Sequence, residues 1–301
     1  MNCYFPILFL VPAFDGTQID YSYFRIAKRL WETSTFDLAT LATRHRLHLP
    51  YQTMDVFLSR CNLELCVADQ ESLDAATAAF QSLRLALYTE GVSPFLSPFI
   101  TTYSINEYSG INSRDSESLR KNLPPGLQEG LRSDEAILEA WPLELSFTCM
   151  IREDGIRLSK EQFGRAVDKA EQWCKLKASS KTLPVIEEVI TTAPKITPPT
   201  QSVLHIWSGL EVLFPNVGAE LSFRMALYLA QLLSPSSERT AVYERVRASY
   251  ALRSAITHGS RQDVSMNDWQ ETWSLLMEAI NGVLVRGKMP SEKELLAELL
   301  A

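Results

Sequence analysis

Apolar and polar residues follow strand-like and helix-like patterns in turn through the first half of the chain. An apolar run at residues 3–14 predicts a buried strand that ends in a turn at Asp15-Gly16. The pattern then predicts a short helix at Tyr21–Trp31. The alternation at Val56–Val67 predicts a second strand. Strands and helices are therefore mixed in this part of the chain.

A helix with clear 3-4 spacing comes next. Asp69 is its predicted N-cap, its pattern reaches Tyr88, and Gly91 ends it. Its apolar stripe consists of Leu73, Ala76, Phe80, Leu83 and Leu87.

Three further segments complete the N-terminal pattern. Phe95–Ile105 has the composition of a strand, and the prolines at its start favour the edge of a sheet. Residues 106–137 are rich in Ser, Asn, Gly and charge and predict a long loop, and Trp141–Ile151 predicts another strand. Ser159 and Gln162 form a capping box for a helix. The stripe of that helix is Phe163, Val167, Ala170 and Cys174.

Four prolines punctuate residues 181–200, and after them every segment has helical spacing. The expected helices are Val185–Thr191, 202–214, 219–233, a long one from Pro235-Ser236-Ser237 to His258, one from Ser265 and Asp268 to Gly287, and a short tail capped by Ser291 and Glu294. The sequence thus predicts an α+β protein. An N-terminal mixed α/β domain at residues 1–180 is followed by an all-α helical bundle at residues 181–301.

Each of the longer helices in the bundle has an apolar face. In the helix at 202–214, Glu211 lies at the border of that face. The inward positions are Val203, Ile206, Trp207, Leu210, Leu213 and Phe214 in this helix, and Leu221, Met225 and Leu232 in the next. The helix that begins at Ser265 carries Met266, Trp269, Trp273, Leu276, Ile280 and Val283.

Composition and charge narrow the class of function. The formal charge is −7, of which residues 201–301 carry −2 and residues 1–200 carry −5. Proteins that coat nucleic acid non-specifically are usually basic, so any RNA contact should be a local site. The five cysteines lack framework spacing and indicate reduced thiols in a cytoplasmic protein. The apolar N-terminal run lacks a basic start and a cleavage pattern, which favours a strand over a signal sequence, and no run is long enough to span a membrane.

Residues 247–260 bring candidate chemistry to one helix end. Arg253 and His258 precede Gly259, which closes the helix. An arginine can hold a phosphate, and a histidine can move a proton near neutral pH. At about 100° per residue, Arg253 lies about 40° from the centre of the apolar stripe and His258 lies nearly opposite that stripe. His258 is therefore not placed as a core histidine, and the alternative to a catalytic role is a C-cap that interacts with the helix dipole. The stripe itself is Val242, Val246, Ser249, Leu252 and Ile256.

Several motifs of the bundle resemble a known family. The segments LHIWSGLEVLF, ELSFRMALYLAQLL and YALRSAITHG follow one another in this order. They resemble the Apea-like branch of the HEPN superfamily, in which an "LE-x-LF" helix precedes an "E-L-x-x-R" helix and an "R-S-x-x-x-H-G" helix end follows. The superfamily signature is an arginine, four to six residues and a histidine, which here is Arg253-x4-His258. The resemblance covers residues 183–288, about a third of the chain, and does not extend to the N-terminal domain.

This resemblance implies an endoribonuclease that works without a metal or a cofactor, as a homodimer, often in antiviral defence or as a toxin. Cleavage by the RNA's own 2′-hydroxyl needs a base, an acid and cations around the phosphorus. We assign proton transfer to His258 and charge stabilisation to Arg253. One histidine cannot easily act as both acid and base, so we expect a second Arg253/His258 pair from a partner copy.

Three residues are candidates for support of this pair. Ser254 shares the face of His258, and Tyr250 lies one turn earlier on the face of Ser254. Glu211 could orient Arg253 or His258. The alternative for Glu211 is a structural ion pair with Arg224 inside the bundle.

Other constellations carry less chemistry. His45-x2-His48 and Cys61-x4-Cys66 contain zinc-ligand residue types, but the cysteine spacing does not fit a zinc knuckle. On a strand, Cys61 and Cys66 would face opposite sides. We therefore expect no metal site.

The basic segment from Arg44 to His48 could touch RNA, and the alternative is a solvated turn. Trp269 and Trp273 belong to a core or a dimer seam and not to a base-stacking platform. The chain also lacks a phosphate-binding loop of the Walker A type, a G-x-G-x-x-G fingerprint, a nucleophile elbow and an H-E-x-x-H motif.

Two functions from different classes remain open. The first is a ribonuclease effector whose N-terminal domain senses a partner or ligand and regulates the enzyme. The second is a non-catalytic HEPN module that binds a partner or nucleotide and mediates oligomerisation. The net negative charge of the chain favours the non-catalytic module, and the intact Arg253/His258 pair favours the ribonuclease.

Overall fold

The fold is α+β, as the sequence pattern predicts. A computed structural model describes residues 1–30, 34–44, 46, 50–97, 99–108, 117–121, 128, 138–140, 157–218, 220–233 and 238–300. The described residues form two compact units, which we call the sheet unit (residues 1–80, 91–140 and 157–167) and the helical unit (residues 81–90 and 168–300). The sequence places a domain boundary near residue 180, whereas these units divide within a helix that ends at Ala178.

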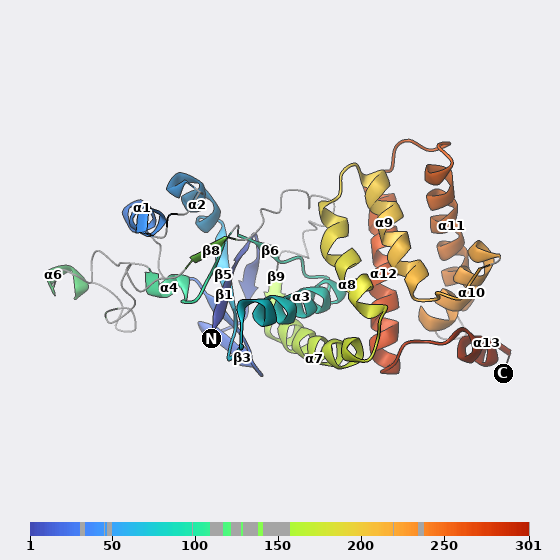
Figure 1. Ribbon diagram of the computed structural model, residues 1–301, viewed down its shortest axis with the longest axis horizontal. Helices are drawn as coiled ribbons and strands as arrows, with labels where there is room; N and C mark the ends of the chain where they lie inside the picture. The colour runs from blue at the N-terminus through green and yellow to red at the C-terminus, as the bar shows by residue number, and fades with distance from the viewer. Residues whose placement is uncertain are drawn as a thin grey trace. The chain divides into compact units, whose positions relative to one another are not determined.

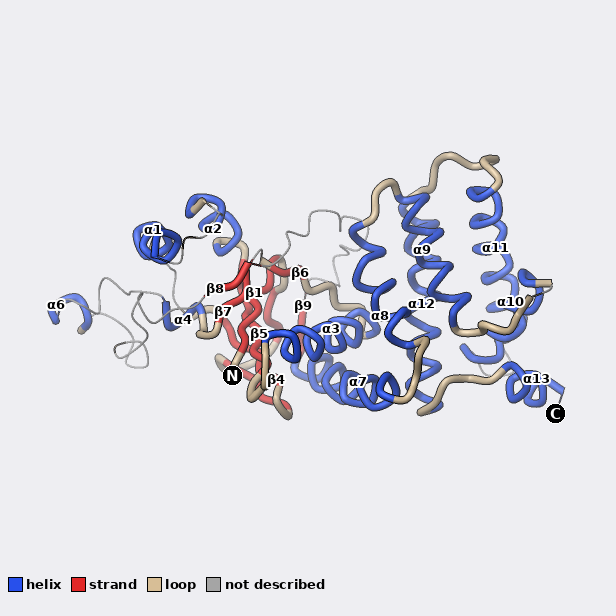
Figure 2. The backbone as a smooth tube through the Cα atoms, viewed as in Figure 1, coloured by secondary structure: helices blue, strands red, loops and turns tan. Residues whose placement is uncertain are grey.

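An antiparallel sheet with the strand order β3-β4-β5-β1-β7-β8 forms the centre of the sheet unit, and β6 also pairs with β1 (Figures 1 and 2). Its strands are β1 (Cys3–Leu8), β3 (Gln18–Tyr21), β4 (Phe24–Lys28), β5 (Cys61–Val67), β6 (Phe95–Leu96), β7 (Phe99–Thr101) and β8 (Leu138–Ala140). A separate parallel pair joins β2 (Val11–Ala13) to β9 (Arg157–Ser159).

One face of the sheet is apolar and fully buried. Phe5 of β1, Leu65 of β5 and Ile26 of β4 are neighbours across the strands, and none of them is exposed. Phe80 stacks on Phe5 with a ring-centroid distance of 4.4 Å. Phe80 belongs to α3 (Leu73–Thr89), so this helix covers the apolar face. The face alternates with a polar one, because successive residues of a strand point to opposite sides.

Four of the five residues in the predicted stripe of α3 are buried, namely Ala76, Phe80, Leu83 and Leu87, and the fifth, Leu73, is half-buried. The predicted cap is wrong. Ser72, and not Asp69, caps the helix, because its hydroxyl accepts a hydrogen bond from the backbone of Ala75. Asp69 instead has a positive φ of 58° and lies in the turn before it.

The predicted helix at Tyr21–Trp31 is wrong, because this segment contains the turn between β3 and β4 and the whole of β4. Phe24 and Ile26 are buried at a spacing of two and pair with β5, and these cross-strand contacts override the helical spacing of the segment. Ser22, with φ at 54°, makes the turn between the two strands.

Two other strand predictions also need correction. The predicted strand at Val56–Val67 begins only at Cys61, because α2 (Tyr51–Leu58) precedes it. β7 lies between β1 and β8 and is therefore not an edge strand.

Within the predicted loop at 106–137, most residues lie outside the described part of the chain. The described residues form α4 (Ile105–Tyr108) and α6 (Glu117–Arg120). The predicted strand at Trp141–Ile151 also lies outside the described residues, as does Cys149.

α1 (Thr35–Arg44) was not anticipated by the sequence pattern. Arg44 ends this helix and is exposed, and Arg46 follows it with a positive φ of 49°. His45 and His48 lie outside the described residues.

The helical unit contains the C-terminal parts of α3 and of α7 (Lys160–Ala178). The predicted capping box of this helix is confirmed, because Ser159 and Gln162 exchange hydrogen bonds between side chain and backbone at 3.0 and 3.2 Å. The other helices are α8 (Leu183–Thr192), a 3-10 turn η4 (Ala193–Lys195), α9 (Pro199–Val212), α10 (Leu221–Leu233), α11 (Arg239–Thr257), α12 (Met266–Arg286) and α13 (Glu292–Leu300). Residues 234–237, where the sequence places the start of α11, lie outside the described residues.

The core of the helical unit follows the predicted apolar stripes. All six inward positions predicted around α9 are buried. The capping boxes at Ser265 with Asp268 and at Ser291 with Glu294 are present, and Gly287 closes α12 with φ at 65°. Several expected inward residues differ, since Met266 is exposed and Leu221, Val242, Leu252 and Ile256 are half-buried. Met266 and Leu221 lie at the first turn of a helix, at the rim of the packed interior.

Candidate functional site

Three helices of the helical unit, α9, α11 and α12, are tied together by buried polar contacts (Figure 1). The Trp207 indole N–H donates to Ser249 Oγ at 3.2 Å, and Ser249 Oγ lies 3.1 Å from Thr272 Oγ1. The Trp269 indole N–H donates to Ser202 Oγ at 2.7 Å. Buried polar groups must find hydrogen-bond partners, so these contacts fix how α9, α11 and α12 can be aligned. The serine within the apolar stripe of α11 therefore serves to orient that helix.

This alignment holds Arg253 from two sides. Its Nη2 lies 3.2 Å from Glu211 Oε1 on α9, and both side chains are about a quarter exposed. Its guanidinium also lies 5.6 Å from the ring centroid of Tyr250, which meets Trp207 edge-on. A carboxylate and an aromatic ring both favour a cation at this position.

Arg253 keeps unused hydrogen-bonding capacity. Its Nε is buried and has no hydrogen-bond partner among the described residues, and the contact with Glu211 has ion-pair distance without hydrogen-bond geometry. A guanidinium presents five N–H donors in a fixed plane. Arg253 is therefore a partly exposed cation whose position is held by Glu211 and Tyr250.

The structure shows which residue pairs with Glu211. Glu211 pairs with Arg253, whereas Arg224 pairs with Glu220 on its own side of the bundle, at 3.6 Å. The side chain of Arg224 is therefore occupied elsewhere. Trp207, which the sequence pattern marks only as a core residue, also supports the site through Tyr250. The signal for this role was present, because Trp207 and Glu211 are four residues apart and share one face of α9.

His258 occupies the C-cap of α11 and is exposed. Gly259 follows with φ at 72°. Its N–H donates to Ile256 O, and the N–H of Ser260 donates to Ala255 O, both at 3.0 Å. These two bonds define a Schellman motif, which needs a residue that tolerates positive φ after the cap. The helix end is thus fixed in a geometry that presents His258 to solvent.

Arg253 and His258 do not contact each other through their side chains in the described structure. The contact of His258 with its own helix is through its backbone, since its N–H donates to Ser254 O at 3.0 Å. Ser254 lies one turn before His258 and is half-buried. A single chain thus presents a held cation and a free imidazole at one helix end without joining them.

The next cation along the chain, Arg261, is already paired. Its Nη2 lies 3.0 Å from Asp268 Oδ2, the carboxylate of the capping box of α12. The acidic cap and the Arg261 side chain tie the loop after His258 to the start of α12. The sequence pattern does not single out Arg261, because the contact with Asp268 depends on the path of the loop between them.

The zinc-ligand residue types do not assemble into a candidate centre in the described structure. Among the described residues, no group of three or more His, Cys, Asp or Glu side chains could hold a metal ion. Cys61 and Cys66 are both buried, and burial raises the pKa of each thiol to about 12. None of the described helices combines the length and the apolar character needed to cross a membrane.

Trp269 and Trp273 are buried and stack at a ring-centroid distance of 5.4 Å. Their place in the core is therefore confirmed. Such buried rings offer no face to a nucleic-acid base.

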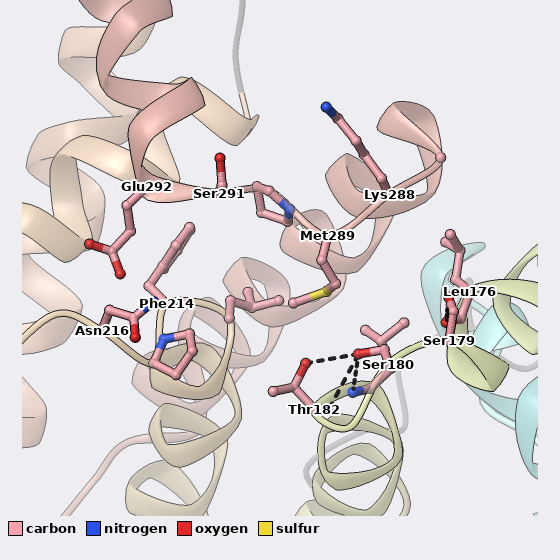
Figure 3. A pocket seen from close by; sticks show the side chains of 15 residues that line it. Leu176, Ser179, Ser180, Thr182, Phe214, Asn216, Lys288, Met289, Ser291 and Glu292 are labelled. Atoms are coloured by element: carbon pink, nitrogen blue, oxygen red, sulfur yellow. Dashed lines mark hydrogen bonds between the residues drawn. The ribbon is translucent and has the colours of Figure 1, made fainter.

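A cavity of about 470 Å³ opens elsewhere in the helical unit (Figure 3). It is lined mainly by helix ends and loops, with Phe214, Met289 and Glu292 among its walls. None of the predicted site residues lines it. The candidate site at Arg253 and His258 is therefore a surface feature of a helix end and not an enclosed pocket.

Comparisons of this chain with protein-family models, with curated proteins and with solved structures found no match.

Proposed function

We propose that this protein is a metal-independent endoribonuclease of HEPN type. The observation that carries the proposal is the helix end of α11, where Glu211 and Tyr250 hold Arg253 and a Schellman motif presents His258 to solvent. The order of the surrounding motifs, which resembles Apea-like HEPN proteins, supports the same function.

The proposed reaction is an attack of the RNA's 2′-oxygen on the adjacent phosphorus. The proton of the 2′-hydroxyl passes to one imidazole, the bond between phosphorus and the 5′-oxygen breaks, and a second imidazole in its cationic form protonates the leaving 5′-oxygen. The products are a 2′,3′-cyclic phosphate and a 5′-hydroxyl. The partly exposed guanidinium of Arg253 stabilises the charge that develops on the phosphate oxygens.

One chain supplies one of the two imidazoles that this scheme requires. A two-fold homodimer of the helical unit brings a second His258 and a second Arg253 to the same groove. We therefore propose that the active species is a homodimer in the cytoplasm, acting as a defence or toxin effector. In this proposal the N-terminal domain is the sensing or regulatory part.

The proposal is tested by the cleavage of a fluorescent RNA in the presence of EDTA. The wild-type chain is expected to cut the RNA and to leave cyclic phosphate ends. His258→Ala and Arg253→Ala should each lower the rate about 100-fold or more, because positioned proton transfer and charge stabilisation each contribute on this scale.

His205→Gln is the matched control for the histidine variant. His205 lies on α9 of the same unit, and its Nε2 is 2.7 Å from Thr192 Oγ1. The rate of His205→Gln should equal that of the wild type. Cleavage that persists in His258→Ala, or that stops on addition of EDTA, contradicts the proposal.

A second candidate function is a non-catalytic module that mediates oligomerisation. The Arg253–Glu211 ion pair favours this function, because the Glu211 carboxylate neutralises part of the positive charge with which Arg253 would bind a phosphate. This function predicts a stable dimer with no RNA cleavage by the wild-type chain.

A further inference from the structure

The polar face of the sheet unit carries a second candidate site. Tyr4 of β1 and Arg25 of β4 both pair with Cys66 of β5, so the three side chains form a row across the sheet. Glu64 lies two residues before Cys66 and therefore on the same face. These four residues line a pocket of about 280 Å³.

The segment 104–107 forms the wall of this pocket. It is anchored by Asn106, whose Nδ2 donates to Lys28 O at 3.1 Å and whose Oδ1 accepts from the Leu30 N–H at 2.7 Å. The wall is thus held to the end of β4 by an amide that uses both of its ends. These hydrogen bonds therefore hold the wall of the pocket in place.

Glu64 is the most deeply buried charged group of the pocket. Its side chain is 2% exposed, and Oε2 accepts the Ile105 N–H at 2.6 Å. Burial raises its pKa to about 8 in spite of this hydrogen bond and one from Ser104. This shift favours the neutral acid near pH 7 when the pocket is empty, because a buried carboxylate without a cation is costly.

Among the described residues that line the pocket, the one cation is Arg25, and it does not neutralise Glu64. The Nε of Arg25 lies 2.6 Å from Asp20 Oδ1, and this exposed carboxylate takes up its charge. Glu107 adds a further carboxylate to the wall. Burial, followed by the charges of Cys66 and Glu107, raises the pKa of the Tyr4 hydroxyl, so Tyr4 stays neutral beside Glu64.

We propose that this pocket binds a small organic cation of the guanidinium class, with Glu64 as its counter-ion. A planar guanidinium pairs two N–H groups with the two oxygens of a carboxylate, and an aromatic side chain such as Tyr4 favours a cation beside it. Binding requires Glu64 to release its proton.

Proton release gives the proposal a pH signature. Apparent affinity should rise about tenfold from pH 6 to pH 7 and level off above pH 8, because the ligand binds the ionised acid. Tyr4, Cys66, Arg25 and Asp20 do not titrate in this range. Burial raises the pKa of Cys66 to about 12 and also raises that of Tyr4, and Arg25 and Asp20 are paired with each other. Glu107 is the remaining charged group that faces Glu64.

The experiment is isothermal titration calorimetry of the full chain with agmatine. The matched probe is N-carbamoylputrescine, which replaces the guanidinium by a neutral ureido group of the same shape. We expect agmatine to bind with the stated pH dependence and the ureido compound to bind at least tenfold more weakly. In two buffers of different ionisation enthalpy, the heats at pH 7 should show release of close to one proton.

Glu64→Gln separates binding from folding. Its side-chain oxygen still accepts the Ile105 N–H, so the thermal midpoint should not fall, while agmatine binding should drop at least tenfold and lose its pH dependence. Glu107→Gln should weaken binding and leave the pH dependence in place. Equal binding of agmatine to the wild type and to Glu64→Gln overturns the proposal, as does the absence of binding to the wild type.

A guanidinium can belong to a free metabolite or to an arginine side chain. A blocked Gly-Arg-Gly peptide distinguishes the two sources, because a pocket of this size should prefer agmatine. Binding of the peptide alone contradicts the small-molecule proposal. The calorimetry needs no RNA, so its outcome is independent of the proposed ribonuclease activity.

Discussion

Arg253 depends on Glu211 and Tyr250 for its position. A charge pair with both partners about a quarter exposed contributes at most about 1 kcal/mol to folding, so the role of Glu211 should be visible in activity more than in stability. The aromatic contact through Tyr250 to Trp207 holds the guanidinium from a second side.

Glu211→Gln should lower the rate of RNA cleavage about tenfold to 100-fold, because the guanidinium is no longer held in one place. Its thermal midpoint should stay close to that of the wild type. The matched control is Glu220→Gln, which removes a comparable ion pair with Arg224 and should leave the rate unchanged. Equal rates for the two variants would show that Glu211 does not position Arg253.

The residues of this site could be named from the sequence, but their contacts could not. Helical spacing placed His258 away from the apolar stripe, and it is exposed. The same spacing left three partners open for Glu211, because Arg253, His258 and Arg224 all lie on neighbouring helices. Only the hydrogen bonds among Ser249, Trp207 and Thr272 fix which turn of α11 lies opposite Glu211.

At the scale of elements, the helices of the helical unit were predictable and the strands of the sheet unit were less so. Amphipathic spacing and capping boxes are local signals, and they placed α7, α9 and α12 within a few residues. A short strand depends on its neighbours across the sheet. The segment that forms β4 has helical spacing, and it becomes a strand because β5 pairs with it.

The Schellman motif at the end of α11 gives a test at this scale. Gly259→Ala places a Cβ at φ 72° and should cost about 1–2 kcal/mol of unfolding free energy. Since the same change disturbs the presentation of His258, RNA cleavage should fall at least tenfold. Thermal melting and a cleavage assay of the same sample measure both effects.

Gly287→Ala is the matched control, because Gly287 closes α12 with φ at 65°. It should lower the thermal midpoint by a similar few degrees and leave the rate of cleavage unchanged. If both variants lose the same fraction of activity, the loss comes from reduced stability and not from the helix end.

For the whole molecule, the central question is how many chains make one active site. The structure of one chain places a held Arg253 and a solvent-exposed His258 at the same helix end, without contact between their side chains. An acid and a base are both required for the proposed reaction. In the proposed function, the second imidazole comes from another copy.

Mixing wild-type chains with His258→Ala chains, after subunit exchange, measures this directly. If both histidines of a dimer act in one site, activity should follow the square of the wild-type fraction and fall to about one quarter in an equal mixture. Activity that falls in direct proportion, to about one half, would contradict a shared site. A wild-type chain that cleaves no RNA would contradict the proposed function itself.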